Sequence, residues 1–258
     1  MRLIITGAAG RIGSQMVEEL SQSYDLCLMD RSPVPGRASI VADLSRNRAR
    51  SYWRLWPGSG PSLWTELFEG AEVVAHFAAA RRPKAPWRQL LHNNIQATWN
   101  VLEAAARHRV RRVIYASSNW AVKALERDLA PACYMPDGPK ISSDAPPCPL
   151  TAYGISKAFG EVAGRTFVAE GKLSSFVAVR IGSYPPAPPK DEEGRRLWIG
   201  ARDLRSLLRR CVETEFEGFH VVYGVSAQPE APYDLSHTRR LLSWEPRQLP
   251  SQMIMSKP

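Results

Sequence analysis

Two side chains in the second half of the sequence have the types and the spacing of a proton-transfer pair. Tyr153 and Lys157 stand four residues apart, so on a helix both would share one face. A phenol has a pKa of about 10 and is a poor base at neutral pH. A neighbouring ammonium favours the phenolate and lowers that pKa. The pair therefore predicts a tyrosine that takes a proton from a substrate hydroxyl group.

A pair of serines offers this tyrosine a partner. Ser117 and Ser118 follow the apolar run at residues 112–116, which has the pattern of a strand. In open α/β folds, ligands bind at the carboxyl edge of the sheet, where residues directly after a strand lie. A serine hydroxyl at that place can hold a reacting oxygen against a tyrosine, and we predict this role for Ser118.

The start of the chain has the features of a phosphate-binding turn. The segment GAAGRIG places Gly7, Gly10 and Gly13 at three-residue intervals. It follows an apolar run at residues 2–6 and opens a helical pattern. A pyrophosphate must approach the backbone closely, which a Cβ would block, and a helix N-terminus presents free N–H groups. We therefore predict that a dinucleotide lies on this turn.

An acidic residue follows at a distance suited to the ribose of such a dinucleotide. Asp30 stands 23 residues after Gly7, at the end of the second apolar run. A carboxylate there accepts hydrogen bonds from the ribose and repels a 2′-phosphate, which favours NAD over NADP. Arg31 beside it could pair with that phosphate, so NADP stays open. Asp43 and Leu44, after the third apolar run, are predicted to flank the adenine.

The elements that must hold these groups alternate between two periodicities. Short apolar runs typical of buried strands occupy residues 2–6, 25–29, 38–41, 72–77, 112–116 and 174–180. Helical spacing occupies residues 12–21, 87–107 and 153–170. Strands alternating with helices indicate an α/β fold, with a doubly wound parallel sheet of the Rossmann type covered on both faces.

Three segments interrupt this alternation. They combine prolines with glycine, arginine or tryptophan and show no clear period, and they occupy residues 45–61, 131–149 and 185–194. We predict loops at all three, the first of them an insertion. Long loops in α/β proteins often lie where ligands bind.

Composition excludes several classes of protein. The chain has 258 residues, of which 44% are apolar and 23% charged, as in a globular domain with at most a small appendage. No apolar run reaches 18 residues, which excludes a membrane span, and the first residues lack the pattern of a signal peptide, which predicts the cytoplasm. The four cysteines show no C-x-x-C spacing, so we predict neither a disulfide framework nor a metal site.

The charge is strongly positive. Thirty-four Lys and Arg against 25 Asp and Glu give +9, with a pI of about 9.6. Such a charge suits a nucleic acid or an anionic ligand. The basic residues are scattered along the chain, however, which favours an arginine-rich solvated surface, and we predict no nucleic-acid partner.

Taken together, these residues resemble the extended short-chain dehydrogenase/reductase superfamily, in particular the NAD-dependent epimerase/dehydratase family. Further matching segments are residues 74–79, 94–105 and 115–118. The later part looks most like bacterial uronate dehydrogenases, through residues 180–183, 221–227, 236–237 and 242–246. The resemblance implies an NAD-binding Rossmann domain at residues 1–180. It also implies a small substrate-binding C-terminal portion at residues 181–258, within the same structural unit.

The resemblance also implies which residues contact the cofactor, NAD. Lys157 would hold its ribose and tune Tyr153, and the positively charged nicotinamide would also favour the phenolate. The residues implied to line it are Gly7, Gly10, Arg11, Ile12, Gly13, Asp30, Asp43, Leu44, Phe77, Ala78, Ala79, Asn94, Tyr153, Lys157 and Ile181.

Substrate contacts are implied in the same way. Ser118 and Asn119 correspond to a substrate-contacting pair, followed by Trp120 where the subgroup usually has histidine. Trp120 is a candidate to stack on a sugar face or on a more apolar substrate. The remaining implied contacts are Arg81, near the place of a small polar residue, Ser183, and Arg195 or Arg196 as the grip on a substrate carboxylate.

The function that follows is NAD-dependent oxidation of a hydroxyl group of a sugar or sugar acid; the uronate enzymes oxidise C1 and give an aldarolactone. Two alternatives remain open: an NAD-dependent sugar (nucleotide) epimerase, and a non-catalytic NAD-binding regulatory protein. A 4,6-dehydratase needs an acid beside the serine, and Asn119 and Trp120 supply none. The expected partners are a small-molecule substrate and a second copy of the chain in a homo-oligomer, with no nucleic acid and no membrane.

Overall fold

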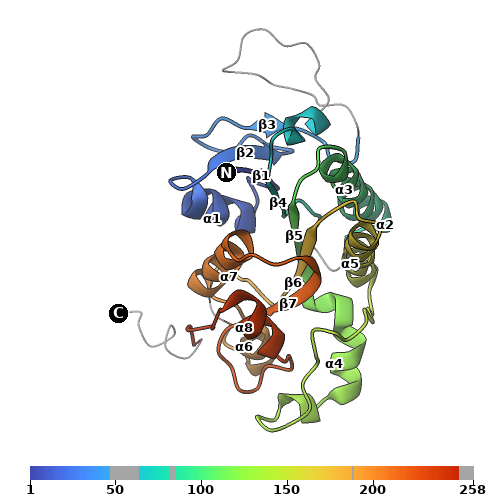
Figure 1. Ribbon diagram of the computed structural model, residues 1–258. Coiled ribbons are helices and arrows are strands. Elements are labelled where there is room, and N and C mark those ends of the chain that lie inside the picture. Colours follow the sequence, from blue (N-terminus) through green and yellow to red (C-terminus); the bar gives the residue numbers. More distant parts are fainter. Residues whose placement is uncertain (47–63, 82–84, 188, 250–258) are drawn as a thin grey trace.

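Strands from both halves of the chain form one parallel sheet (Figure 1). The computed structural model describes residues 1–46, 64–81, 85–187 and 189–249. Within them, seven strands follow the order β3-β2-β1-β4-β5-β6-β7. They are β1 (Arg2–Thr6), β2 (Asp25–Asp30), β3 (Ile40–Val41), β4 (Val73–His76), β5 (Arg112–Ser118), β6 (Ser175–Ile181) and β7 (Gly218–Gly224). The order reverses beside β1, at its junction with β4, and ligands bind at the carboxyl ends of such a pair.

Helices cover both faces of this sheet (Figure 1). α1 contacts α7 on one face, and α3 contacts α5 on the other. The α-helices are α1 (Arg11–Leu20), α2 (Trp87–Leu90), α3 (Ala97–Arg107), α4 (Lys123–Leu129), α5 (Ala152–Ala169), α6 (Glu192–Leu197), α7 (Ala201–Glu213) and α8 (Ser236–Leu242). The other helical turns are η1 (Trp64–Phe68), η2 (Leu91–Gln96), η3 (Asn119–Val122) and η4 (Ala132–Tyr134). The predicted α/β fold of the Rossmann type is confirmed.

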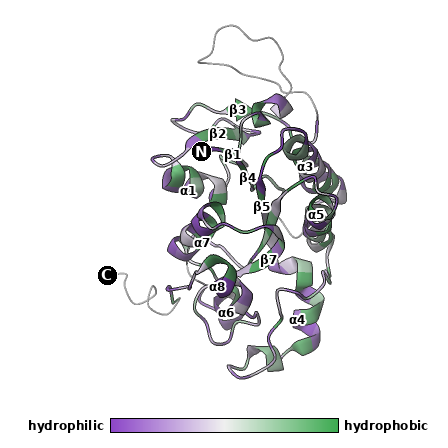
Figure 2. Cartoon of the chain, in the orientation of Figure 1, coloured by the Kyte–Doolittle hydropathy of each residue, from purple (hydrophilic) through white to green (hydrophobic). Residues whose placement is uncertain are grey.

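Each face of the sheet has its own apolar core. Successive side chains of a strand point to opposite faces, so Leu3 and Ile5 pack on the α1 side while Ile4 packs on the α3 side. All seven residues of β5 and of β6 are buried. Apolar colour accordingly runs along the strands in Figure 2, whereas the helices alternate between apolar and polar. Burial on both faces explains why the strands read as continuous apolar runs.

A buried ion pair ties α5 to β6. Arg180 donates from Nε to Glu161 Oε1 over 3.0 Å and from Nη2 to Glu161 Oε2 over 2.8 Å. Ser117 donates to the same carboxylate over 2.5 Å, and Arg180 Nη1 donates to the Tyr223 hydroxyl over 3.0 Å. Burial opposes the charge of Arg180, but the hydrogen bonds and the charge of Glu161 outweigh it and raise the pKa of Arg180. Through these contacts α5 is joined to β5, β6 and β7.

The predicted strands and helices are present, with two differences of detail. The helix predicted over residues 87–107 is interrupted, because η2 is a π-helical turn between α2 and α3. The predicted loop at residues 185–194 ends early, because Asp191 accepts a hydrogen bond from Gly194 N and caps α6. The loop at 131–149 contains only the short turn η4. The predicted insertion at residues 45–61 lies outside the described residues from position 47 onward.

The C-terminal portion completes the sheet. β7 pairs with β6 along its whole length, from Ser175 against Gly218 to Ile181 against Gly224. This strand lies at the edge and begins with three half-buried residues, so it lacks a long apolar run and went unpredicted. The four cysteines are all free. Among the described residues, no helix combines the length and apolar character needed to cross a membrane.

Candidate active site

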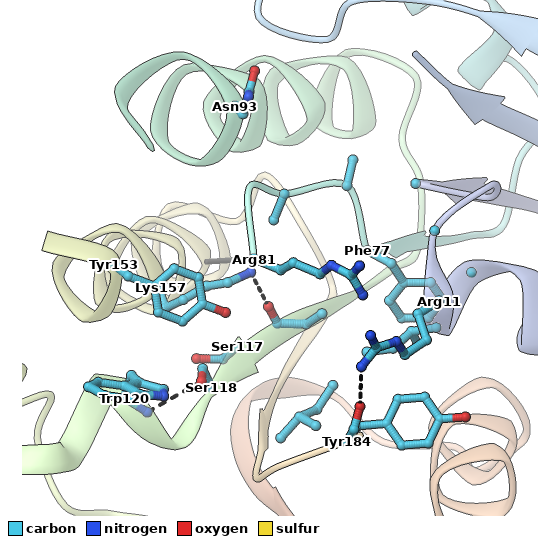
Figure 3. A pocket seen from close by; sticks show the side chains of 18 of the residues that line it. Arg11, Phe77, Arg81, Asn93, Ser117, Ser118, Trp120, Tyr153, Lys157 and Tyr184 are labelled. Carbon is cyan, nitrogen blue, oxygen red and sulfur yellow. Dashed lines mark hydrogen bonds between the residues drawn. The ribbon is translucent and has the colours of Figure 1, made fainter. Parts of the chain in front are cut away.

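A cavity of about 890 Å³ opens at the carboxyl ends of the strands. The glycine turn after β1 forms one wall, and the loops after β2, β4, β5 and β6 form the others. Figure 3 shows Tyr153, Ser118 and Trp120 on one side of this cavity, facing Arg11 and Tyr184 on the other. The cavity therefore lies where the strand order reverses, as expected for a doubly wound sheet.

The glycine turn fits a bound dinucleotide. Gly7 has φ +71°, and a Cβ there would lie 2.5 Å from Ala78 N, so the turn can pack against the β4 loop only with glycine. A Cβ at Gly13 would lie 2.1 Å from the Gly7 carbonyl oxygen. Gly10 is exposed in the cavity wall and caps α1 without a side chain. The opening turn of α1 thus presents backbone N–H groups to the cavity, as phosphate binding requires.

The carboxylate at the end of β2 is tied to this turn. Asp30 Oδ2 accepts a hydrogen bond from Ala9 N over 3.0 Å, and Oδ1 accepts one from Ser32 N over 3.1 Å. Arg31 Nη1 donates to Asn93 Oδ1 over 3.1 Å, so the two side chains bridge this end of the cavity. The arrangement fixes the Asp30 carboxylate beside the turn, at the position suited to a ribose.

Three side chains converge beyond the other end of the turn. Ser118 ends β5, while Tyr153 and Lys157 stand on the first two turns of α5. All three are buried yet line the cavity. Lys157 Nζ donates to the Ala116 carbonyl over 2.7 Å, which holds the ammonium beneath the sheet edge. The predicted meeting of the serine with the Tyr–Lys pair is therefore present in the geometry.

In the protein without NAD, the pKa of the tyrosine is raised, and the ammonium alone does not lower it. Burial raises the pKa of Tyr153, and a hydrogen bond with Ser118 offsets only part of that rise. Burial also lowers the pKa of Lys157 to about 8. The reason is that Lys157 points its ammonium at the Ala116 carbonyl, with Nζ 5.9 Å from the centre of the Tyr153 ring. Protein groups alone therefore do not make this phenol acidic.

The local fold of the β5 end sets the geometry of Ser118. Its Oγ accepts a hydrogen bond from Trp120 N over 3.3 Å and donates to Asn119 Oδ1 over 3.2 Å. Gly154 lets α5 approach this turn, because a Cβ there would lie 2.4 Å from the Trp120 carbonyl oxygen. Thr151 caps α5 by accepting from Gly154 N over 3.1 Å. The turn and the helix therefore fix Ser118 and Tyr153 relative to each other.

Most of the predicted site residues are brought together. Those that line this one cavity are Gly7, Gly10, Arg11, Ile12, Gly13, Asp30, Asp43, Leu44, Phe77, Ala78, Ala79, Arg81, Ser118, Asn119, Trp120, Tyr153, Lys157, Ile181 and Ser183.

Asn94 does not line the cavity, contrary to its predicted cofactor contact. Its side chain is buried below the wall, where Oδ1 accepts from Ala80 N over 2.7 Å and Nδ2 donates to Ser156 Oγ over 2.8 Å. It braces the loop after β4 against α5. Asn93 takes the place in the wall instead. The π-helical turn changes the helical register at this point, which periodicity alone could not reveal.

Arg195 and Arg196 also lie outside the cavity lining. Arg195 Nη1 donates to the Lys190 carbonyl over 3.0 Å. Arg196 pairs with Glu192 and covers the ring of Tyr134, with its Cζ 4.4 Å from the ring centre. Both side chains are half-buried and are held by these contacts. The structure therefore does not bring either arginine into the lining of the cavity, where the implied grip on a substrate carboxylate would place it.

Several cavity residues were missed by the sequence reasoning. Lys123 stands three residues after Trp120, on the helix that follows the serine turn, and that spacing was a usable signal. Asp191 and Glu193 line the cavity from the start of α6, behind a proline-rich segment that hid the helix. Among the described residues, no cluster of His, Cys, Asp and Glu is arranged to hold a metal ion.

Comparison with known proteins gives a consistent result. The chain matches the family model described as NAD dependent epimerase/dehydratase family over residues 3–204. It is 32% identical to the NAD-dependent glucose-6-phosphate dehydrogenase of Haloferax volcanii, over 95% of this chain and 92% of that protein. It is 29% identical to the L-arabinose 1-dehydrogenase (NAD(P)(+)) of the same organism, over 95% and 96%. The crystal structure of uronate dehydrogenase from Agrobacterium tumefaciens superposes with a TM-score of 0.78 at 27% identity, covering all of this chain and 90% of the other.

Proposed function

The chain belongs to the NAD-dependent epimerase/dehydratase family, and from that premise we propose that it is a dehydrogenase that oxidises a hydroxyl group of a sugar or sugar acid with NAD. One observation carries the proposal: Ser118, Tyr153 and Lys157 line the same cavity as the glycine turn. The relatives are named as dehydrogenases of different sugars, glucose 6-phosphate and L-arabinose.

The residues that would hold NAD lie along the cavity. The turn at Gly7 and Gly10 and the N-terminus of α1 suit the pyrophosphate, and Asp30 suits the adenosine ribose. Lys157 suits the second ribose. When bound, NAD supplies an acceptor for the hydride that leaves the substrate carbon. In this scheme residues 1–180 hold the cofactor and residues 181–258 complete the substrate end.

The side chains of the protein handle the proton. Tyr153 removes the proton of the substrate hydroxyl, and Ser118 holds that oxygen in place. Burial keeps the Tyr153 phenol protonated in the free protein. Bound NAD would add the positive charge that the polypeptide alone does not supply. Lys157, with its pKa lowered to about 8, adds charge below that pH. The substrate carbon loses the hydride and its hydroxyl oxygen loses the proton, so the C–O group becomes a carbonyl.

Tyr153→Phe tests this scheme with a change of one oxygen atom. We expect turnover with NAD to fall by about a thousand-fold or more, because only the proton acceptor is lost, while NADH binding followed by fluorescence stays within a few-fold. Tyr24→Phe is the matched control, since that hydroxyl contacts Glu213 away from the cavity. The assay is NADH absorbance over a panel of aldoses and sugar acids. Unchanged turnover in Tyr153→Phe would refute the mechanism, and sugar conversion without NADH accumulation would indicate an epimerase.

We also propose that the protein works in the cytoplasm as a homo-oligomer, without nucleic acid or membrane. The support is an apolar outer face on α5, where the side chains of Ile155 and Val162 are 50% and 56% exposed. These residues stand seven apart and share one helix face. Sedimentation of the purified chain tests the proposal: a species above the 28.8 kDa monomer is expected, and a monomer at micromolar concentration would contradict it.

A further inference from the structure

The substrate end of the cavity has an unusual charge arrangement. The residues that line this end include Trp120 and Lys123, from the turn after β5 and the start of α4, and Asp191 and Glu193, at the start of α6. This region decides which sugar the proposed dehydrogenase accepts. The inference below rests on that proposed function and narrows its substrate class.

The cation at this end is already neutralised. Lys123 Nζ donates to Glu126 Oε1 over 2.7 Å. Glu126 is only 1% exposed and also accepts hydrogen bonds from the hydroxyls of Tyr134, over 3.0 Å, and Tyr233, over 2.8 Å. A buried carboxylate without its cation is costly, so Lys123 must stay with Glu126 to balance that charge. It is therefore not free to pair with an anionic substrate.

The arginines of the cavity belong to the opposite end. Arg11 Nη1 donates to the Tyr184 carbonyl over 2.6 Å, beside the glycine turn. Arg31 is bound to Asn93 at the far end, next to Asp30. Figure 3 shows the Arg81 side chain extended along the cavity in the direction of Phe77 and Arg11, away from Trp120. These three guanidinium groups thus lie where a pyrophosphate and its riboses are expected.

Two residues with carboxylate side chains line the cavity at the start of α6. Asp191 lines the cavity while one of its oxygens accepts from Gly194 N over 2.7 Å, and Glu193 lines it two residues later. Arg195 and Arg196, the nearest cations on the same helix, are directed elsewhere. A substrate that carries a carboxylate or phosphate would meet the like charges of Asp191 and Glu193 at this end.

The same wall suits an uncharged sugar. Carboxylate oxygens accept hydrogen bonds from sugar hydroxyl groups. The Trp120 ring offers an apolar face against which the C–H face of a sugar ring can pack. From this combination we propose that the substrate is a neutral aldose, and that Glu193 is the residue that discriminates against uronates and sugar phosphates.

The test compares three sugars that share a ring and differ in the charge at C6. Purified protein with NAD is given D-glucose, D-glucuronate or D-glucose 6-phosphate, and the neutral pentoses D-xylose and L-arabinose extend the neutral set. We expect kcat/KM for the best neutral sugar to exceed that for either anionic sugar by at least about ten-fold. A higher kcat/KM for an anionic sugar would overturn the inference and leave the proposed function intact. No NADH from any sugar would refute the proposed function itself, and the inference with it.

A matched pair of variants localises the discrimination. Glu193→Gln removes the cavity carboxylate, whereas Glu192→Gln removes its neighbour, which pairs with Arg196 outside the cavity lining. We expect Glu193→Gln to raise kcat/KM for D-glucuronate relative to D-glucose by about three-fold or more, and Glu192→Gln to leave that ratio unchanged. A ratio that is the same in both variants would show that Glu193 does not discriminate.

Discussion

Two buried charges stand one turn apart on α5, and their surroundings differ completely. Lys157 borders the cavity, donates to a backbone carbonyl and, among the described residues, forms no salt bridge. Glu161, four residues later, is bound by two hydrogen bonds from Arg180 and one from Ser117. Burial lowers the pKa of Lys157 to about 8, whereas Glu161 raises the pKa of Arg180.

The difference separates groups that react from groups that support them. A charge that a partner has already neutralised cannot act on a bound ligand, so the Glu161–Arg180 pair serves to join α5 with β5 and β6. Lys157 has no salt-bridge partner among the described residues, at a cost in stability, and this leaves its charge available to a bound cofactor. Three changes test this separation, in decreasing order of expected effect.

The largest effect on stability is expected from Glu161→Gln. The variant keeps the volume but leaves Arg180 buried without its carboxylate, and breaking such a pair costs about 3–5 kcal/mol. The free energy of unfolding in urea measures it. The double change of Glu161 and Arg180 to Met should recover much of the loss, because no lone charge then remains. A loss below about 1 kcal/mol for the single change would show that the pair does not support the fold.

An intermediate effect of opposite sign is expected from Lys157→Met. The pKa falls from 10.5 in the unfolded chain to about 8, which corresponds to a cost of about 3 kcal/mol. The unfolded chain binds this proton more tightly, so the cost is complete below pH 8 and disappears as the pH rises to 10.5. The variant should therefore lose turnover yet be more stable than the wild type at pH 7, by up to that amount. Unfolding midpoints at pH 7 and pH 10.5 measure this gain, and a variant less stable than wild type at pH 7 would contradict it.

The smallest effect is expected at an exposed pair. Arg209 contacts Glu213 over 2.7 Å, with side chains 40% and 31% exposed. Exposed pairs contribute about 0–1 kcal/mol because water and salt screen them. Glu213→Gln should thus change the free energy of unfolding by less than about 1 kcal/mol, and by even less in 1 M salt. A loss as large as that of Glu161→Gln would remove the distinction between buried and exposed pairs.

The sequence predicted the reacting residues of the site better than the elements at the margins of the cavity and of the sheet. Short-range sequence patterns predicted the glycine turn and the pair Tyr153 and Lys157, because a turn and one face of a helix are local features. The continuous apolar strands were visible for the same reason. Family resemblance, rather than periodicity, indicated the carboxyl end of β6 as part of the site.

Features that depend on distant contacts were not predictable. β7 is recognisable as a strand only through its pairing with β6. The π-helical turn η2 shifts the helical register, so that Asn93 rather than Asn94 lines the cavity. The periodicity is helical on both sides of this turn, so the sequence pattern does not reveal the shift. The contacts of Arg195 with Lys190 and of Arg196 with Tyr134 depend on where α6 starts, and that start depends on the Asp191 cap behind a proline-rich segment. The pKa of Tyr153 depends on burial, which no local spacing reveals.

The order of the strands has a consequence for how the protein can be made. β1 is synthesised first and lies inside the sheet, with β2 on one side and β4 on the other. When β4 leaves the ribosome, its pairing partner β1 has already been synthesised. The strands β5, β6 and β7 then add to the sheet one after another in chain order. Growth of the sheet can therefore follow translation, with the N-terminal part folding first. The final strand, β7, covers the edge of β6 only after most of the chain has emerged, and until then that edge is open to wrong partners.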